Sequence, residues 1–168
     1  QILHSAKLVG SNLLRMVSLS QEINDGMASH VLELIEDGLK SIGKKLDKST
    51  VLILGISYKP NVKDIQITPA EPVVQKLKAA GAKLRIYDPY FKSTNVFDIL
   101  TESSLESALV GADATVLITA HDEFRNIEPE FLLAKSNSLV FIDTRGIMDM
   151  RVAKKAGLIT RGIGRGGR

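Results

Sequence analysis

The sequence contains no cysteine and no tryptophan among its 168 residues. The missing cysteine excludes a disulfide framework, a thiolate metal site and a cysteine nucleophile within this chain. It is compatible with a reducing compartment, and we expect a cytoplasmic protein. Aromatic residues make up only 5% of the chain, which argues against a platform that stacks single-stranded nucleic acid.

The sequence also lacks a large excess of charge of either sign and has no long apolar run. Lys and Arg number 22 against 19 Asp and Glu, so the formal net charge is only +3. No run approaches the roughly 20 apolar residues that span a bilayer, and the start does not read as a signal peptide. Hydrophobic residues make up 44% of the chain and charged residues 24%, as in globular domains. We expect neither a nucleic acid nor a membrane as partner.

Residues 1–46 contain no proline, and their pattern predicts a long helical segment. Gly43 and the lysines after it are typical of a helix C-terminus. The chain opens at Gln1 within this pattern, so we expect a piece of a longer protein. The apolar stripe could pack on its own domain, form a seam between two copies or contact a domain outside this chain. Its members recur at spacings of three and four: Ile23, Met27, Val31, Leu34, Ile35 and Leu39.

From Thr50 onward, predicted strands alternate with predicted helices. A continuous apolar run such as VLILG is typical of a strand that is buried on both faces of a parallel sheet. The alternation predicts an α/β fold with a doubly wound parallel sheet, which follows the helical segment. We divide the chain into residues 1–47 and 48–168. Strands are predicted at 51–55, 83–88, 114–119, 139–143 and 158–161, and helices at 69–80, 105–110, 129–135 and 150–156.

Candidate binding residues follow from this fold. In a doubly wound sheet, ligands bind outside the carboxyl ends of the strands, where the strand order reverses. Tyr58 and Lys59 follow the first strand, and a lysine ammonium suits a phosphate oxygen; a solvated surface lysine is an equal alternative. Arg145 follows the fourth strand and can hold a phosphate or carboxylate, or it can pair with Asp143 or Asp149.

Other polar residues receive a structural interpretation. We interpret Asp88 as a turn residue at a strand end and Asp64 as an acceptor that shapes its loop. No G-x-S-x-G motif supports hydrolase chemistry. The glycines of a literal G-x-G-x-x-G open no helix, so we reject it as a phosphate loop: Gly162, Gly164 and Gly167. The histidines have no ligand spacing and indicate no metal site: His4, His30 and His121.

Several segments together resemble the UDP-glucose/GDP-mannose dehydrogenase family. The segment VLILGISYKPNVKDIQITP is similar to the signature that opens the family's C-terminal domain. The resemblance implies the end of a central helical dimerisation region, followed by a Rossmann-like domain that binds a UDP-sugar. The supporting segments occur in the family's order: QEINDGM, IYDPY, GADATVLITAHDEF, FIDTRG and RGIGRG.

The resemblance also implies an activity for the full-length protein. Family members oxidise the sugar C6 alcohol to a carboxylate with NAD, through a thiohemiacetal on a catalytic cysteine. That cysteine and most of the NAD site would lie upstream, so we expect no catalytic residue here and no turnover by this chain alone. By resemblance, Tyr58, Lys59 and Arg145 contact the substrate. Gln66 stands where the family has an arginine that contacts NAD, and it carries no charge.

The resemblance further implies a homodimer through the helix at residues 20–39. Lys59, Pro60 and Asn61 resemble the UDP-N-acetylmannosamine dehydrogenase branch, with UDP-glucose 6-dehydrogenase as the alternative. A protein of another class, a stand-alone nucleotide-binding module without catalysis, is also compatible with the fold.

Overall fold

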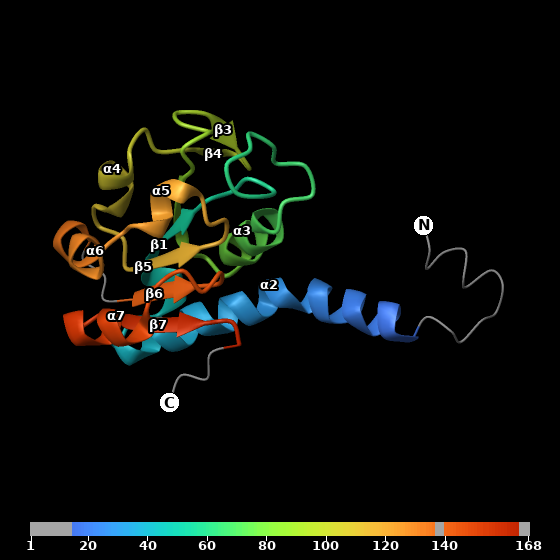
Figure 1. The fold of residues 1–168 in the computed structure, drawn as a ribbon, viewed down its shortest axis with the longest axis horizontal. Coiled ribbons are helices and arrows are strands. Elements are labelled where there is room, and N and C mark those ends of the chain that lie inside the picture. Colours follow the sequence, from blue (N-terminus) through green and yellow to red (C-terminus); the bar gives the residue numbers. More distant parts are fainter. Residues whose placement is uncertain (1–14, 137–139, 165–168) are drawn as a thin grey trace.

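The computed structural model describes residues 15–136 and 140–164 (Figure 1). Predictions for the start of the helical segment, for residue 139 and for the end of the RGIGRG segment lie outside the described residues. The same holds for His4 and Gly167. Among the described residues, no helix is both long enough and apolar enough to cross a membrane.

The predicted helical segment forms one continuous helix, α2 (Arg15–Ser41). It ends as predicted, because Gly43 adopts a left-handed conformation with φ 72° and the Lys44 amide donates to the Leu39 carbonyl at 3.0 Å. Gly38 lets the helix lie close to the sheet, since a Cβ there would be 2.6 Å from Cγ1 of Val140. One side of the C-terminal half is buried: Ala28, Val31, Ile35, Gly38 and Leu39.

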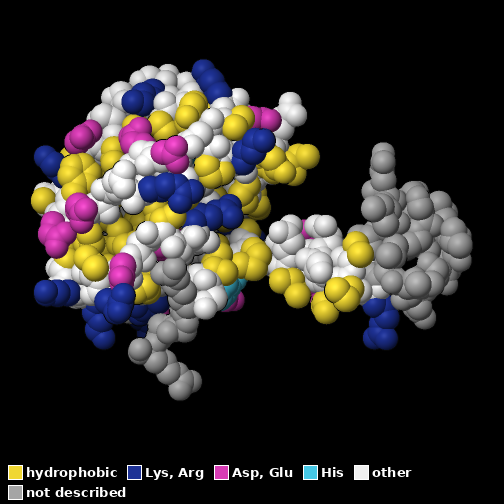
Figure 2. Space-filling model, viewed as in Figure 1, with side chains coloured by type: hydrophobic (Ala, Val, Ile, Leu, Met, Phe, Trp, Pro, Cys, Tyr) yellow, Lys and Arg dark blue, Asp and Glu magenta, His cyan; other side chains and the backbone are white. Residues whose placement is uncertain are grey.

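The N-terminal part of α2 projects away from the rest of the molecule (Figure 1). Figure 2 shows hydrophobic side chains on this projecting part. The second half of the helix packs on its own domain, as one alternative for the apolar stripe predicts, and its first half is exposed. A seam between two copies stays a prediction. The exposed apolar side chains are Met16, Val17, Leu19 and Ile23.

The chain then forms a five-stranded sheet in the order β2-β1-β5-β6-β7, and all neighbouring strands are parallel. This arrangement confirms the predicted fold class. The strands are β1 (Thr50–Leu54), β2 (Lys83–Tyr87), β5 (Ala114–Leu117), β6 (Val140–Asp143) and β7 (Ile159–Gly162). The helices between them include α3 (Ala70–Ala79), α4 (Leu105–Leu109), α6 (Pro129–Lys135) and α7 (Met150–Ala156).

Two hydrophobic cores lie on opposite faces of this sheet. Val51 and Ile53 of β1 pack with α2 and α3, whereas Leu52 and Leu54 pack with α4, α6 and α7. Successive strand residues point to opposite faces, so a run that is apolar throughout requires helices on both. The sheet is therefore doubly wound, as the run VLILG predicts.

Short elements depart from the prediction. The structure adds a hairpin of β3 (Asn95–Val96) and β4 (Ile99–Leu100), a helical turn α5 (Asp122–Arg125) and a 3₁₀ turn η2 (Leu46–Lys48). Elements this short show no periodicity that a sequence could reveal. The strand predicted at 114–119 ends at Leu117. The Ile118 amide still donates to the Leu54 carbonyl of β1 at 2.9 Å, and the chain bends at Thr119.

Candidate functional site

The strand order reverses between β1 and β5. From β1 the chain passes through α3 to β2 on one side, and it then returns to β5 on the other side of β1. The carboxyl ends of β1 and β5 therefore flank the crevice where ligands bind in doubly wound sheets. Two segments meet there, residues 55–68 after β1 and residues 118–121 after β5.

Gly55 allows these two segments to approach each other closely. Its φ of 77° lies in the left-handed region, and a Cβ at this position would lie 2.3 Å from the Thr119 carbonyl oxygen. Thr119 Oγ1 also donates to the Ser57 carbonyl at 2.6 Å. Only glycine combines a left-handed backbone conformation with room for the Thr119 carbonyl. The start of the 55–68 loop therefore depends on the missing side chain of Gly55.

Asp64 organises the outer part of the 55–68 loop. The Tyr58 amide donates to its carbonyl at 2.7 Å, and the Gln66 amide donates to its Oδ1 at 2.8 Å. The prediction that Asp64 is an acceptor that shapes the loop is confirmed. The loop then leads into α3, where Thr68 Oγ1 accepts from the Ala70 amide at 3.2 Å.

Asp88 is the central acceptor beneath this loop. It is completely buried, and its Oδ1 accepts from the Tyr90 amide at 2.9 Å, which is the predicted turn. That prediction was incomplete, since Oδ2 binds four further donors. They are the Ile56 amide at 2.8 Å, the Ser57 amide at 3.0 Å, Ser57 Oγ at 2.9 Å and His121 Nε2 at 3.0 Å.

These bonds keep Asp88 ionised despite its burial. Desolvation by burial raises the pKa of the carboxyl, but the hydrogen bonds from His121 and from the Tyr90 and Ile56 amides together outweigh it. The pKa of Asp88 is therefore lowered from its usual value.

His121 was not predicted to have a role in this site, yet it is completely buried there. Its Nδ1 accepts from the Asn61 amide at 2.9 Å, while its Nε2 faces Asp88. Its ring contacts those of Tyr90 and Phe124, with centroid distances of 5.2 and 5.6 Å. His121 and Asp88 are 33 positions apart in the chain, so no local motif reveals the pair.

The predicted site residues are exposed at this edge of the sheet. Tyr58 is 52% exposed, and Lys59 and Gln66 are exposed on the same loop. Arg145 is exposed after β6, and its Nε donates to the Ile118 carbonyl at 2.5 Å.

In the described part of the chain, Arg145 does not form the ion pair that was its alternative role. Asp143 Oδ1 accepts from the Arg145 backbone amide at 3.0 Å, and Asp149 pairs with Arg151 at 3.1 Å. The Arg145 side chain is therefore held by a backbone carbonyl, which leaves its charge uncompensated by either carboxylate.

The strand order brings the two groups of predicted residues to one place. β5 lies between β1 and β6, and the residues directly after β5 contact both neighbouring loops. Thr119 holds the loop with Tyr58 and Lys59 through the Ser57 carbonyl, and Ile118 holds Arg145. The loop with Lys59 and the loop with Arg145 are thus attached to neighbouring residues of the chain.

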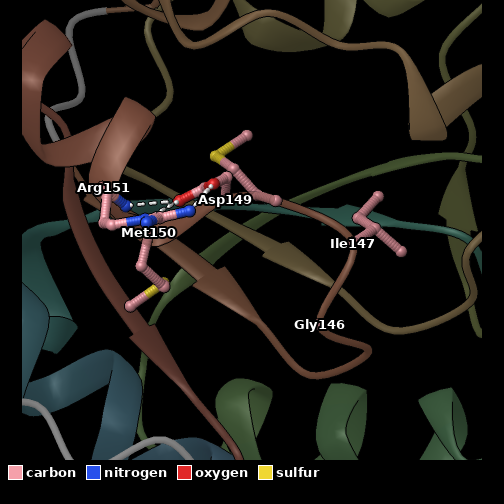
Figure 3. Close-up of a pocket in the computed structure, with 6 residues that line it drawn as sticks. Gly146, Ile147, Asp149, Met150 and Arg151 are labelled. Carbon is pink, nitrogen blue, oxygen red and sulfur yellow. Dashed lines mark hydrogen bonds and ion pairs between the residues drawn. The ribbon is translucent and has the colours of Figure 1, made fainter.

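An open hollow of about 450 Å³ lies next to this edge, along residues 146–151. Figure 3 shows Asp149 and Arg151 directed at each other and Ile147 pointing away from them. Asp149 and Arg151 already compensate each other there, and no predicted site residue lines the hollow. We therefore place the candidate site at the crevice between β1 and β5. Among residues 15–136 and 140–164, no cluster of three potential metal ligands is found.

Comparison with known proteins gives the relationships of this chain. A family model described as the UDP binding domain of the UDP-glucose/GDP-mannose dehydrogenase family matches residues 52–150. The UDP-N-acetyl-D-mannosamine dehydrogenase of Methanocaldococcus jannaschii is 34% identical over 155 residues, which cover 90% of this chain and 34% of that protein. This chain thus spans about a third of the length of the curated relative.

Solved structures of similar proteins share the fold. The UDP-D-ManNAc dehydrogenase of Pyrococcus horikoshii superposes with a TM-score of 0.79 at 30% identity, over 92% of this chain and 34% of that one. The NDP-N-acetyl-D-galactosaminuronic acid dehydrogenase of Methanosarcina mazei Go1 superposes with a TM-score of 0.82 at 29% identity, over 88% of this chain and 31% of that one.

Proposed function

Because this chain belongs to the UDP-glucose/GDP-mannose dehydrogenase family, we propose that it forms the UDP-sugar-binding domain of an NAD-dependent UDP-sugar 6-dehydrogenase. The observation that carries the proposal is the crevice between β1 and β5, where the residues directly after β5 hold both the loop with exposed Lys59 and the side chain of exposed Arg145. The names of two relatives support UDP-N-acetyl-D-mannosamine as the sugar nucleotide. We place the protein in the cytoplasm, which its lack of cysteine supports.

The residues of this chain would bind and orient the substrate rather than react with it. Lys59 offers three donors on a flexible stem, which suits a pyrophosphate oxygen. Arg145 offers a planar pair of donors for a phosphate or a carboxylate. Tyr58 adds a half-exposed ring and a hydroxyl beside Lys59. The oxidation of C6 needs a nucleophile, and this chain has no cysteine to supply it.

NAD, when bound, would accept the hydride from the sugar carbon. Within the described residues, our candidate contact to it is Gln66, whose exposed side-chain amide fits a neutral hydrogen bond and not a charged one. The glycine motif rejected above begins at Gly162, which is the last residue of β7. We therefore assign most of the NAD site to a part of the protein outside this chain.

Lys59→Ala tests the substrate site. A hydrogen bond to a charged group contributes about 1.5–3 kcal/mol, so this substitution is expected to weaken UDP binding by about 10- to 150-fold. Isothermal titration of UDP into the 168-residue chain would measure the change. Lys83→Ala is the matched control. Lys83 is exposed at the start of β2, at the amino ends of the strands, whereas the crevice lies at their carboxyl ends. Equal affinities for the two variants would return Lys59 to the solvated-surface alternative.

We also propose that residues 1–47 are the end of a central helical region, residues 48–168 the UDP-sugar-binding domain, and that the protein is a homodimer through the helix at 20–39. The apolar side chains that remain exposed for such a contact lie on the projecting part of α2, where Ile23 is 58% exposed. Val31 is only 4% exposed, so it belongs to the core of its own domain.

Ile23→Glu tests this dimer seam. A charge placed in an apolar contact is costly to desolvate, so light scattering over a concentration series should show two chains for the unsubstituted protein and one for the variant. Asn24→Glu adds the same charge at a neighbouring exposed position and should leave the mass unchanged. A mass of one chain for the unsubstituted protein at every concentration would contradict the seam.

A further inference from the structure

We propose that His121 is a positioning residue: paired with Asp88, it clamps the segment 57–61 at both ends and thereby holds Tyr58 and Lys59 at the crevice. The clamp consists of the buried pair Asp88 and His121, whose Oδ2 and Nε2 lie 3.0 Å apart. Its role in ligand binding rests on the function proposed above, whereas the clamp itself is a feature of the fold.

Both ends of the segment attach to this one pair. At the start, the Ser57 amide and Ser57 Oγ donate to Asp88 Oδ2 at 3.0 and 2.9 Å. At the end, the Asn61 amide donates to His121 Nδ1 at 2.9 Å. Lys59 lies midway between these attachment points, so the pair determines where the exposed lysine emerges.

The hydrogen bonds also determine the tautomer of His121. Nδ1 accepts an amide proton and so carries none of its own, while Nε2 faces a carboxylate oxygen and must carry the proton. Both ring nitrogens are thus engaged by the protein. His121 has no nitrogen left for a ligand, which is why its role is positioning and not catalysis.

The far end of the clamp is reinforced from the other side. Asn61 Oδ1 accepts from the Asp122 amide at 3.1 Å, so Asn61 and the segment after His121 hold each other reciprocally. Asn61 has a φ of 62°, a conformation that asparagine tolerates better than most residues. The His121 ring, which contacts the rings of Tyr90 and Phe124, gives the Asn61 amide a buried partner.

Three variants of the chain separate the contacts. His121→Phe keeps an aromatic ring and removes both hydrogen bonds. His121→Asn can retain an acceptor near Asn61, and His121→Gln can retain a donor toward Asp88. We expect the exchange of the Asn61 amide with deuterated water to accelerate at least tenfold in His121→Phe and His121→Gln, and less in His121→Asn. The Val116 amide in β5 should be unaffected and serves as the internal reference.

UDP titration into the same proteins adds the functional readout. We expect His121→Phe to bind UDP at least tenfold more weakly, with Lys59 still present. Unchanged exchange of the Asn61 amide in His121→Phe would overturn the clamp. Nitrogen NMR of the unsubstituted chain provides a check that does not depend on variant folding, since a proton on Nδ1 would also overturn it. If Nδ1 carries no proton and the Asn61 amide exchanges faster in His121→Phe, but the unsubstituted chain does not bind UDP, the proposed function is refuted and the clamp is retained.

Discussion

Asp88→Ala is expected to lower the free energy of unfolding by about 3–5 kcal/mol, because several buried donors lose their acceptor and each unsatisfied donor costs about 1–3 kcal/mol. Asp88 is completely buried, and Oδ2 alone accepts four hydrogen bonds. The alanine variant would leave the amides of Ile56 and Ser57, the Ser57 hydroxyl and the His121 ring without their acceptor. Urea unfolding would measure the loss as a lower midpoint at an unchanged slope.

Asp47→Ala is the matched control for Asp88→Ala. Asp47 is exposed in the turn η2, so its substitution should change stability by no more than about 0.5 kcal/mol. Losses of equal size in the two variants would contradict the role of Asp88 as the central acceptor beneath the loop.

The same carboxylate predicts the response of stability to acid. The pKa of Asp88 is lowered in the folded protein, so the unfolded state binds the proton more readily. Its contribution to stability is therefore complete above the unfolded value of about 3.9, and it is lost as the pH falls through the folded value. The stability difference between the unsubstituted protein and Asp88→Asn should narrow below about pH 4. A difference that stays constant down to acid unfolding would contradict this linkage.

Gly55→Ala is the second substitution with a large expected effect. Its φ of 77° places an alanine in the left-handed region, at a cost of about 1–2 kcal/mol. The new methyl group would also lie 2.3 Å from the Thr119 carbonyl oxygen, and such overpacking costs about 1–3 kcal/mol more. Because the obstacle is backbone, the loop must shift, and we expect weaker UDP binding together with the lower stability.

Gly43→Ala separates these two contributions. Gly43 has a similar φ of 72°, but nothing lies within 4 Å of a Cβ built there. This control should therefore show only the conformational cost, and urea unfolding of both variants would give the contact with Thr119 as the difference. Equal losses of unfolding free energy in the two variants would mean that the loop moves away from Thr119 without an energetic cost, which would contradict the importance of the close approach.

Much of the fold could be predicted from the sequence. The helices α6 (Pro129–Lys135) and α7 (Met150–Ala156) have the predicted bounds, and the apolar run of β1 indicated a strand covered on both faces. These features are local, because the spacing of apolar residues within a strand or helix predicts that element without any other part of the chain. Tyr58 and Lys59 lie exposed on the loop after β1, where the sequence predicts them, and their contact with a ligand stays a prediction.

Tertiary structure alone decided how these pieces combine. The strand order places the crevice between β1 and β5, and it attaches Arg145 of a distant loop to the residue after β5. The same packing divides α2 into a buried half and an exposed half. The pairing of Asp88 with His121 depends on two strand ends that meet only in the folded sheet. A sequence shows which side chains can hydrogen-bond, but their partners are chosen by contacts between residues far apart in the chain.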